Sequence, residues 1–340
     1  MVMIISSTDD YSTNDVIDWL RYYSIKFIRI SIDDEIRYES VTINNTKLNI
    51  NFSINNVNYC LSDFTAFWYR RSHFNVFIQK ITSVSDKTLS VQINKHIQSE
   101  TIEIHKLLVK YISTRSINTY NDIHINKLEL LNYAAKIGLK IPDTLITNSK
   151  EEVLHFTKKH QTVITKNFSQ GVFLFNKSRI FNSITRVVNE EIYNMLPEKF
   201  SYTLFQEGIE KLFELRIFYL NGKFYSSAIF SQNDEQTAID FRNYNFFKPN
   251  RTPPFTLPNE MKTKLKKIMN EFRLNSGSID VLVSTENEFI FLEVNPIGQF
   301  GQVSVPCNYF LEEKIALELI KIQKNGIIKN RKSTSFHEVR

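Results

Sequence analysis

The spacing of apolar residues changes along the chain, and this change restricts the fold more than any other feature. In the first hundred residues, short apolar runs alternate with helical patterns such as Asn14–Tyr23, which predicts a small α/β domain. In the last third, apolar runs come in pairs joined by short polar turns, Asn221–Gly222 and Thr285–Asn287, which predicts antiparallel strands. A chain of 340 residues that combines both patterns needs two or three packed units.

The boundaries of these units follow from helix and turn signals. A new unit begins near residue 118, and its first helix, Lys127–Ile137, stops at Gly138. Ser149 and Glu152 have the spacing of a capping box for a second helix, which extends to about residue 160. We therefore predict an N-terminal α/β domain at 1–117, a central small domain at 118–200, a C-terminal antiparallel-sheet domain at 201–325 and a basic tail at 326–340.

Composition and charge exclude several classes of protein. The chain is 42% hydrophobic and 23% charged, which is typical of a globular protein with a sizeable core. No apolar run approaches the roughly 18 residues that span a bilayer, and no basic signal-peptide segment precedes Asp9 and Asp10. Cys60 and Cys307 lie too far apart in sequence to indicate a disulfide framework or a cysteine zinc site. We expect a cytoplasmic protein with no membrane partner.

The net charge of +6 raises the alternative of a nucleic-acid binder. The basic residues are dispersed, however, and their densest cluster lies near the C-terminus, at Lys321, Lys324, Lys329, Arg331 and Lys332. A basic tail explains this cluster as well as a nucleic-acid site does. We expect no nucleic acid as a partner, and a phosphate-rich substrate would also favour a basic site.

Asp280, Glu293 and Asn295 form the most informative group of polar residues. Glu293 and Asn295 are two apart on one predicted strand and point to the same face, and Asp280 lies on the preceding strand. Carboxylate and amide oxygens suit magnesium held between protein and substrate phosphates. A solvated strand face is the alternative, but Glu293 lies in the apolar stretch Phe291–Val294, where an unpaired carboxylate would be costly.

Other polar segments are weaker signals when taken alone. Lys166 ends a predicted strand and precedes a loop with Ser169 and Gly171, whose backbone N–H groups can bind phosphate; a solvated lysine is the alternative. The segment from Gln206 to Ile209 can present backbone groups to an adenine. Glu214 and Arg216 share a strand face, and their spacing alone favours a cross-strand salt bridge.

The segment 240–244 contains an arginine beside an aspartate, Arg242 and Asp240, in a loop-like stretch. Arginine binds carboxylate or phosphate through two parallel hydrogen bonds, and a neighbouring aspartate can orient it. A surface ion pair is an equal alternative at this position.

Taken in order from about Asn118 to the last helix, these segments resemble the ATP-grasp superfamily. The branch they resemble contains the ribosomal-protein glutamate ligases and the graspetide synthetases, which cross-link side chains in a ribosomally made precursor peptide. Within it, Phe67–Arg71, Glu293–Pro296, Gly298–Gly301 and Val305–Tyr309 resemble the peptide maturases of grasp-with-spasm systems. The resemblance implies an ATP-grasp fold preceded by a pre-ATP-grasp domain.

The resemblance also implies a role for each polar segment. It assigns the nucleotide to Lys127, Lys166, Ser169, Gly171, Gln206, Glu207, Ile209 and Glu214, with Glu214 at the ribose. It assigns the acceptor carboxylate and γ-phosphate to Arg216 and Arg242, with Asp240 beside them, and magnesium to Asp280, Glu293 and Asn295. The loop after Lys166 has one glycine where many members of the family have more, so we expect this loop to be less mobile than theirs.

The reaction that the resemblance implies is ATP-dependent. Asp or Glu side chains of a precursor peptide with leader and core would become acyl phosphates, and Ser, Thr or Lys side chains would attack them to give esters or amides. ATP and two magnesium ions would be the cofactors, and a homodimer is compatible with this family. An intermolecular ligase that adds an amino acid is the alternative, and a non-catalytic peptide-binding module is the alternative from another class.

Overall fold

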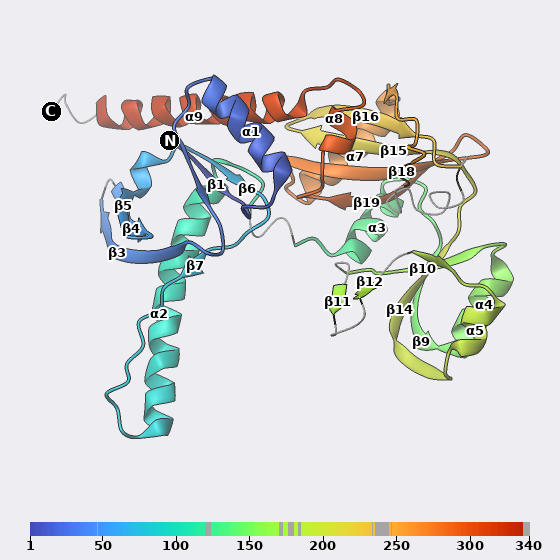
Figure 1. The fold of residues 1–340 in the computed structure, drawn as a ribbon, viewed down its shortest axis with the longest axis horizontal. Coiled ribbons are helices and arrows are strands. Elements are labelled where there is room, and N and C mark those ends of the chain that lie inside the picture. Colours follow the sequence, from blue (N-terminus) through green and yellow to red (C-terminus); the bar gives the residue numbers. More distant parts are fainter. Residues whose placement is uncertain are drawn as a thin grey trace. The chain divides into compact units, whose positions relative to one another are not determined.

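The computed structural model describes residues 1–45, 47–119, 124–169, 173–175, 180–182, 185–232, 234, 245 and 247–335, with only the backbone at 173–175, 180–182 and 327–335. The chain divides into two compact units, one of Met1–His124 with Phe310–Arg340 and one of Ile125–Tyr309 (Figure 1). Within the described part of the chain, every helix is too short or too polar to cross a bilayer.

A four-stranded parallel sheet forms the centre of the first unit. Its order is β2-β1-β6-β8, with bounds Phe27–Ile30, Val2–Ile5, Ala66–Tyr69 and Ser116–Ile117. All four residues of β1 and all four of β6 are buried, as expected for central strands of a parallel sheet with both faces covered. Helices α1 (Tyr11–Tyr22) and α9 (Leu311–Ser335) contact each other, and α9 also contacts β6.

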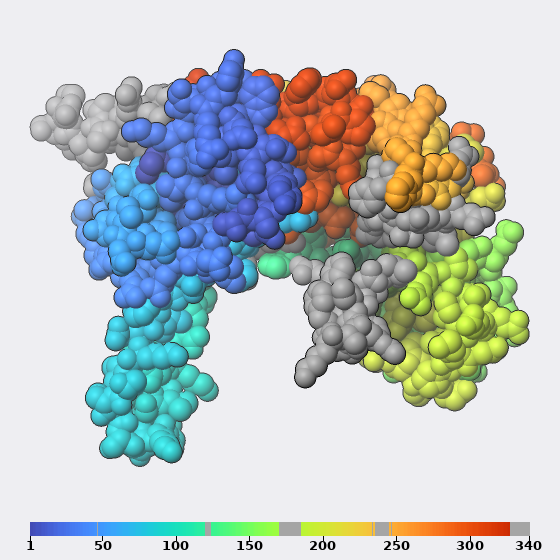
Figure 2. Space-filling view, viewed as in Figure 1, coloured from blue at the N-terminus to red at the C-terminus, as the bar shows by residue number. Residues whose placement is uncertain are grey.

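A second sheet of the first unit, mostly antiparallel, follows β2 in the chain. Its order is β5-β4-β3-β7, with bounds Val57–Cys60, Lys47–Ile54, Glu35–Asn44 and Asn75–Val76. Helix α2 (Lys87–Ser113) buries only Leu108 and Ile112, near its C-terminal end, in the core of this unit. The rest of α2 projects away from the two sheets together with the segment before it (Figures 1 and 2).

The second unit contains two larger sheets. One has the order β13-β10-β14-β9, with bounds Arg186–Val187, Val163–Lys166, Lys199–Glu207 and Thr144–Ser149, and carries α4 (Lys150–Lys159) and α5 (Glu190–Met195). The other has the order β17-β16-β15-β18-β19, with bounds Pro254–Phe255, Lys223–Ile229, Lys211–Leu220, Ser276–Ser284 and Phe289–Asn295. A separate pair joins β11 (Phe173–Phe175) to β12 (Ile180–Asn182).

The five-stranded sheet has one apolar and one polar face. Leu215, Ile217 and Tyr219 of β15 lie in the main core with residues of α3 (Lys127–Lys136) and α7 (Asn259–Glu271). Glu214 and Arg216 therefore point to the opposite face, which confirms the predicted alternation. The short helix α8 (Gly301–Ser304) contacts β15 and β16.

Most predicted elements are present, and the mixed α/β fold is confirmed. Asn221 and Gly222 both have positive φ (43° and 87°), as the predicted type I′ turn requires. The predicted capping box is wrong: Ser149 precedes α4 but makes no capping hydrogen bond, since it ends β9 instead. The last helix is longer than predicted and continues to Ser335.

Candidate active site

Three adjacent strands bring the central polar residues into one row. Arg216 on β15 lies opposite Asp280 on β18, and Asp280 lies opposite Glu293 on β19. Residues directly opposite each other on neighbouring antiparallel strands share a face and can interact. The strand register therefore brings Arg216 and the two predicted carboxylates, Asp280 and Glu293, together in one row across three strands.

Arg216 and Asp280 form a buried ion pair in this row. Arg216 Nη1 lies 2.6 Å from Asp280 Oδ1 and 2.7 Å from Oδ2, and the two side chains are 8% and 10% exposed. Arg216 Nη2 also lies 3.5 Å from the carbonyl oxygen of Gln299. Sequence reasoning left a cross-strand salt bridge open for Arg216, and the structure shows one.

Glu293 is held by a second cation, from α3. Lys127 Nζ donates to Glu293 Oε2 at 2.8 Å, and Asn295 Nδ2 donates to Glu293 Oε1 at 3.0 Å. Burial alone would raise the pKa of Glu293, but the charge and hydrogen bond of Lys127, the charge of Lys166 and the hydrogen bond from Asn295 lower this pKa to about 2. Glu293 is therefore an anion at neutral pH.

Lys166 is the last residue of β10, and its charge acts on Glu293. The structure thus brings Lys127 and Lys166 within electrostatic range of Glu293, although the three residues come from separate elements. Ser169 is exposed in the loop that follows β10. Gly171, Asp240 and Arg242 lie outside the described residues.

The predicted adenine segment leaves the end of β14 and leads to β15. Gln206 Nε2 donates to Thr144 Oγ1 at 2.8 Å, and the Glu207 carboxylate accepts from the backbone N–H of Asp143 at 3.2 Å. A Cβ on Gly208 would lie 2.6 Å from Thr162 Cγ2, so this close approach requires glycine. The segment before Ile209 is consequently fixed in position by contacts with β9 and with the residues that precede β9 and β10.

Glu214 makes contacts that sequence reasoning missed. Lys211 Nζ lies 2.6 Å from Glu214 Oε1, and Ser231 Oγ donates to the same oxygen at 3.2 Å. Residues three apart on a regular strand point to opposite faces. A register shift between Lys211 and Phe213 removes this restriction and places Lys211 beside Glu214. Nothing in the residue pattern marks this bulge.

The side chains of Asp280, Glu293 and Asn295 are of the types that bind magnesium. Asp280, Glu293 and Asn295 supply the oxygen ligands that magnesium prefers, and they lie on one face of β18 and β19. Among the described residues, no group of three or more His, Cys, Asp or Glu side chains could hold a metal ion. The predicted set has two carboxylates and an amide, so any magnesium here would also need oxygen atoms from a substrate or from water.

Solved structures of two similar proteins match this chain over nearly its whole length. A RiPP-associated ATP-grasp ligase from Chryseobacterium gregarium, solved with ADP and a leader and core peptide, is 25% identical; the match covers 95% of this chain and 96% of that one, with a TM-score of 0.75. The macrocyclase MdnC from Microcystis aeruginosa MRC, solved with its precursor peptide MdnA, is 27% identical over 94% and 99% of the two chains, with a TM-score of 0.73.

A third solved structure is similar in fold. The ATP-grasp ligase PsnB, solved with a variant of its minimal precursor, Mg and ADP, is 17% identical over 95% of this chain and 98% of that one, with a TM-score of 0.68. No protein-family model and no curated protein matches the sequence. The ATP-grasp fold and its pre-ATP-grasp domain, expected from the sequence, are thus confirmed over nearly the whole chain.

Proposed function

The chain is an ATP-grasp ligase related to graspetide synthetases, and we propose from this premise that it closes rings in a ribosomally made precursor peptide. ATP would activate Asp or Glu side chains of the peptide as acyl phosphates. Hydroxyl or amine side chains of the same peptide would then attack, which yields esters or amides. The 25% and 27% identity over nearly full length to an ATP-grasp ligase and a macrocyclase, each solved with such a peptide, supports this proposal.

The row of Arg216, Asp280 and Glu293, completed by Lys127, is the observation that carries the proposal. Forming an acyl phosphate requires a carboxylate and a phosphate, both anions, to come into contact. Preorganised cations in a partly buried site make this contact tolerable. Arg216 and Lys127 are held in place by their carboxylate partners at 2.6 and 2.8 Å, so they are oriented before any substrate binds.

We assign the remaining roles as parts of the same proposal. Gln206, Glu207 and Ile209 would contact adenine and Glu214 the ribose, while Lys127, Lys166, Ser169 and Gly171 would contact phosphates. Arg216 and Arg242 would bind the acceptor carboxylate and γ-phosphate, with Asp240 beside Arg242. Magnesium would be held by Asp280, Glu293 and Asn295 and would supply charge neutralisation at the phosphates.

The decisive experiment uses a candidate precursor peptide, to be sought as a short open reading frame with Thr/Ser and Asp/Glu tracts beside the gene for this chain. Incubation with the protein, ATP and magnesium should release ADP and remove the mass of one water from the peptide for each bond. AMP as the product would exclude acyl-phosphate chemistry of this kind. A mass gain equal to an amino acid would favour intermolecular ligation, and binding without any mass change would favour a non-catalytic module.

A matched pair of variants connects this reaction to the proposed site. Glu293→Ala should abolish ADP release, because it removes the proposed metal ligand and the partner of Lys127. Glu288→Ala is the control: Glu288 lies just before β19 and pairs with Lys140 on the surface. The rate of ADP release by Glu288→Ala should match that of the unmodified protein. ADP release by a folded Glu293→Ala variant at the unmodified rate would refute the assignment of Glu293.

Two further expectations belong to the proposal. The predicted homodimer can be tested by multi-angle light scattering of the purified chain. The predicted cytoplasmic location would give the reaction access to ATP and to a newly made peptide, and fractionation of producing cells would test it.

A further inference from the structure

A second polar cluster lies in the first unit, whereas the described residues assigned above belong to the second. It occupies the carboxyl ends of β1 and β6, which are neighbours in the parallel sheet. From β1 the chain continues to β2 on one side, and from β6 it continues to β8 on the other. In open parallel sheets, ligands bind at such a point, because the loops diverge there and leave strand ends accessible.

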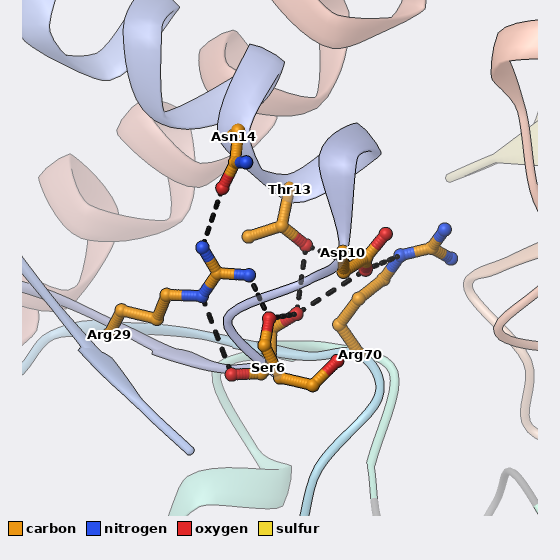
Figure 3. A network of polar contacts seen from close by, with 7 residues as sticks. Ser6, Asp10, Thr13, Asn14, Arg29 and Arg70 are labelled. Atoms are coloured by element: carbon orange, nitrogen blue, oxygen red, sulfur yellow. Dashed lines mark hydrogen bonds and ion pairs between the residues drawn. The ribbon is translucent and has the colours of Figure 1, made fainter.

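Asp10 is the centre of this cluster (Figure 3). Its Oδ2 accepts hydrogen bonds from Thr13 Oγ1 at 2.8 Å, from Arg70 Nε at 3.1 Å and from Ser6 Oγ at 3.3 Å. The side chains of Arg70 and Asp10 are 3% and 1% exposed. A buried carboxylate with this many contacts has a fixed orientation.

The loop that carries Asp10 is also held by Arg29. Arg29 Nη1 donates to Asn14 Oδ1 at 2.6 Å, and its other nitrogens donate to the carbonyl oxygens of Ser6 and Ser7. The backbone N–H of Ser7 donates to the carbonyl oxygen of Arg71 at 3.1 Å, which joins the two loops. The loop that carries Asp10 is therefore held by contacts to β2 and to the loop that follows β6.

The second oxygen of Asp10 is the unusual feature. Oδ1 is buried and has no hydrogen-bond partner among the described residues, whereas Oδ2 has three. An unsatisfied buried carboxylate oxygen is costly, and native structures retain one where a ligand or a bound water completes it. Oδ1 thus marks a position for a hydrogen-bond donor.

Arg71 adds an accessible cation to the loop that follows β6, next to Arg70 in the chain. It follows the buried Arg70 and is itself exposed, and its side chain makes no hydrogen bond or ion pair within the described part of the chain. Its charge acts on the exposed Asp9, whose pKa is lowered mainly by hydrogen bonds from Ser7 and its own backbone. An exposed guanidinium that makes no side-chain hydrogen bond can bind a carboxylate through two parallel hydrogen bonds.

We propose that the carboxyl ends of β1 and β6 bind an acidic segment of the peptide substrate, with a side-chain carboxylate on Arg71 and a main-chain N–H on Asp10 Oδ1. A peptide carries both groups that the site lacks, an N–H donor and an anion. A phosphate group fits less well, because its oxygens would meet the unsatisfied acceptor of Asp10. This inference rests on the proposed function, since it assigns a binding surface to the same substrate.

The test measures peptide binding separately from catalysis. Fluorescence anisotropy of the full chain would use a short labelled peptide of alternating threonine and glutamate, and the same peptide with glutamine in place of glutamate. Arg71→Ala should raise the Kd of the glutamate peptide about tenfold or more, as expected for a lost charged contact. It should change the Kd of the glutamine peptide much less.

Two further variants separate the parts of the site. Arg21→Ala removes another exposed arginine of the same unit, one paired with Asp18 on α1, and should leave both Kd values unchanged. Asp10→Asn should weaken both peptides alike, because both have the same main chain. Asp10 also pairs with Arg70, so Asp10→Asn changes a buried contact of the fold as well. An unchanged melting temperature would show that the weaker binding does not come from a disturbed fold.

The outcomes distinguish this inference from the proposed function. If the unmodified protein modifies its precursor while Arg71→Ala binds the glutamate peptide as tightly as the unmodified protein, the inference alone is wrong. Competition by inorganic phosphate, at constant ionic strength, as strong as that by the unlabelled peptide would also overturn it in favour of a general anion site. If the unmodified protein neither releases ADP nor changes the precursor mass, the proposed function itself fails.

Discussion

The buried pair of Lys211 and Glu214 gives the sharpest test of the site's energetics. Their side chains are 6% and 9% exposed, and Lys211 Nζ lies 2.6 Å from Glu214 Oε1. Lys211→Met would remove this cation and leave the carboxylate in a poorly solvated position. Breaking a buried ion pair by removing one partner costs about 3–5 kcal/mol, so we expect Lys211→Met to lower the free energy of unfolding by about that amount.

A second substitution separates this pair from ordinary packing. Glu214→Gln in the Lys211→Met background removes the stranded charge and keeps an acceptor for Ser231, which donates to Glu214 at 3.2 Å. The double variant should regain about 2 kcal/mol or more relative to Lys211→Met, as contacting residues are coupled by up to about 3 kcal/mol. If the double variant does not regain this free energy, the buried charge of Glu214 is not the cause of the loss in Lys211→Met.

The measurement must report on the second unit. The chain has two tryptophans, Trp19 and Trp68, and both lie in the first unit, so their fluorescence is unsuitable. Hydrogen exchange of the amides of β15 measures the free energy of opening at the site itself. Lys140→Met is the control, because Lys140 and Glu288 are 60% and 37% exposed and such pairs contribute at most about 1 kcal/mol. Equal losses in Lys211→Met and Lys140→Met would refute the reasoning.

Three further outcomes are expected. Gly208→Ala should lower both thermal stability and ATP affinity, measured by calorimetry, because the new Cβ would meet Thr162 Cγ2 at 2.6 Å. The hydrogen bond from Lys159 lowers the pKa of the Asp143 carboxyl, so Lys159→Met should raise that pKa in an NMR titration; an unchanged value would contradict the contact. The stabilisation from this contact should be present above the usual Asp pKa and disappear as the pH falls through the lowered one. Adding EDTA should stop ADP release while leaving the melting temperature unchanged.

The polar face of the site could be predicted because strands alternate. Leu215 and Ile217 belong to one face of β15, and Glu214 and Arg216 to the other, as their spacing indicates. Their partners could not be predicted in the same way. The pairings of Arg216 with Asp280 and of Asp280 with Glu293 depend on strand register, which irregularities in the β15–β18 and β18–β19 ladders shift.

Two elements show where the sequence signal was insufficient. Strand β3, Glu35–Asn44, was not predicted: its apolar residues alternate at 36 and 38 and again at 41 and 43, but the alternation shifts by one residue at the irregularity between Tyr38 and Ser40. Ser149 and Glu152 have capping-box spacing, yet Ser149 makes no capping bond, since sheet pairing with Lys199 determines its backbone. At Ser149 a tertiary contact therefore outweighs a local pattern.

The carboxylates of the site do not depend on a metal ion for charge balance in the folded chain. Asp280 contacts Arg216, Glu293 contacts Lys127, and Glu214 contacts Lys211. Many small metal-binding domains fold only when metal is bound, and uncompensated buried charges destabilise the metal-free state of such sites. Here basic side chains already provide the compensation, so removing magnesium should affect the reaction and leave the fold intact. A clear fall in melting temperature on adding EDTA would mean that these three ion pairs do not stabilise the metal-free chain as their geometry indicates.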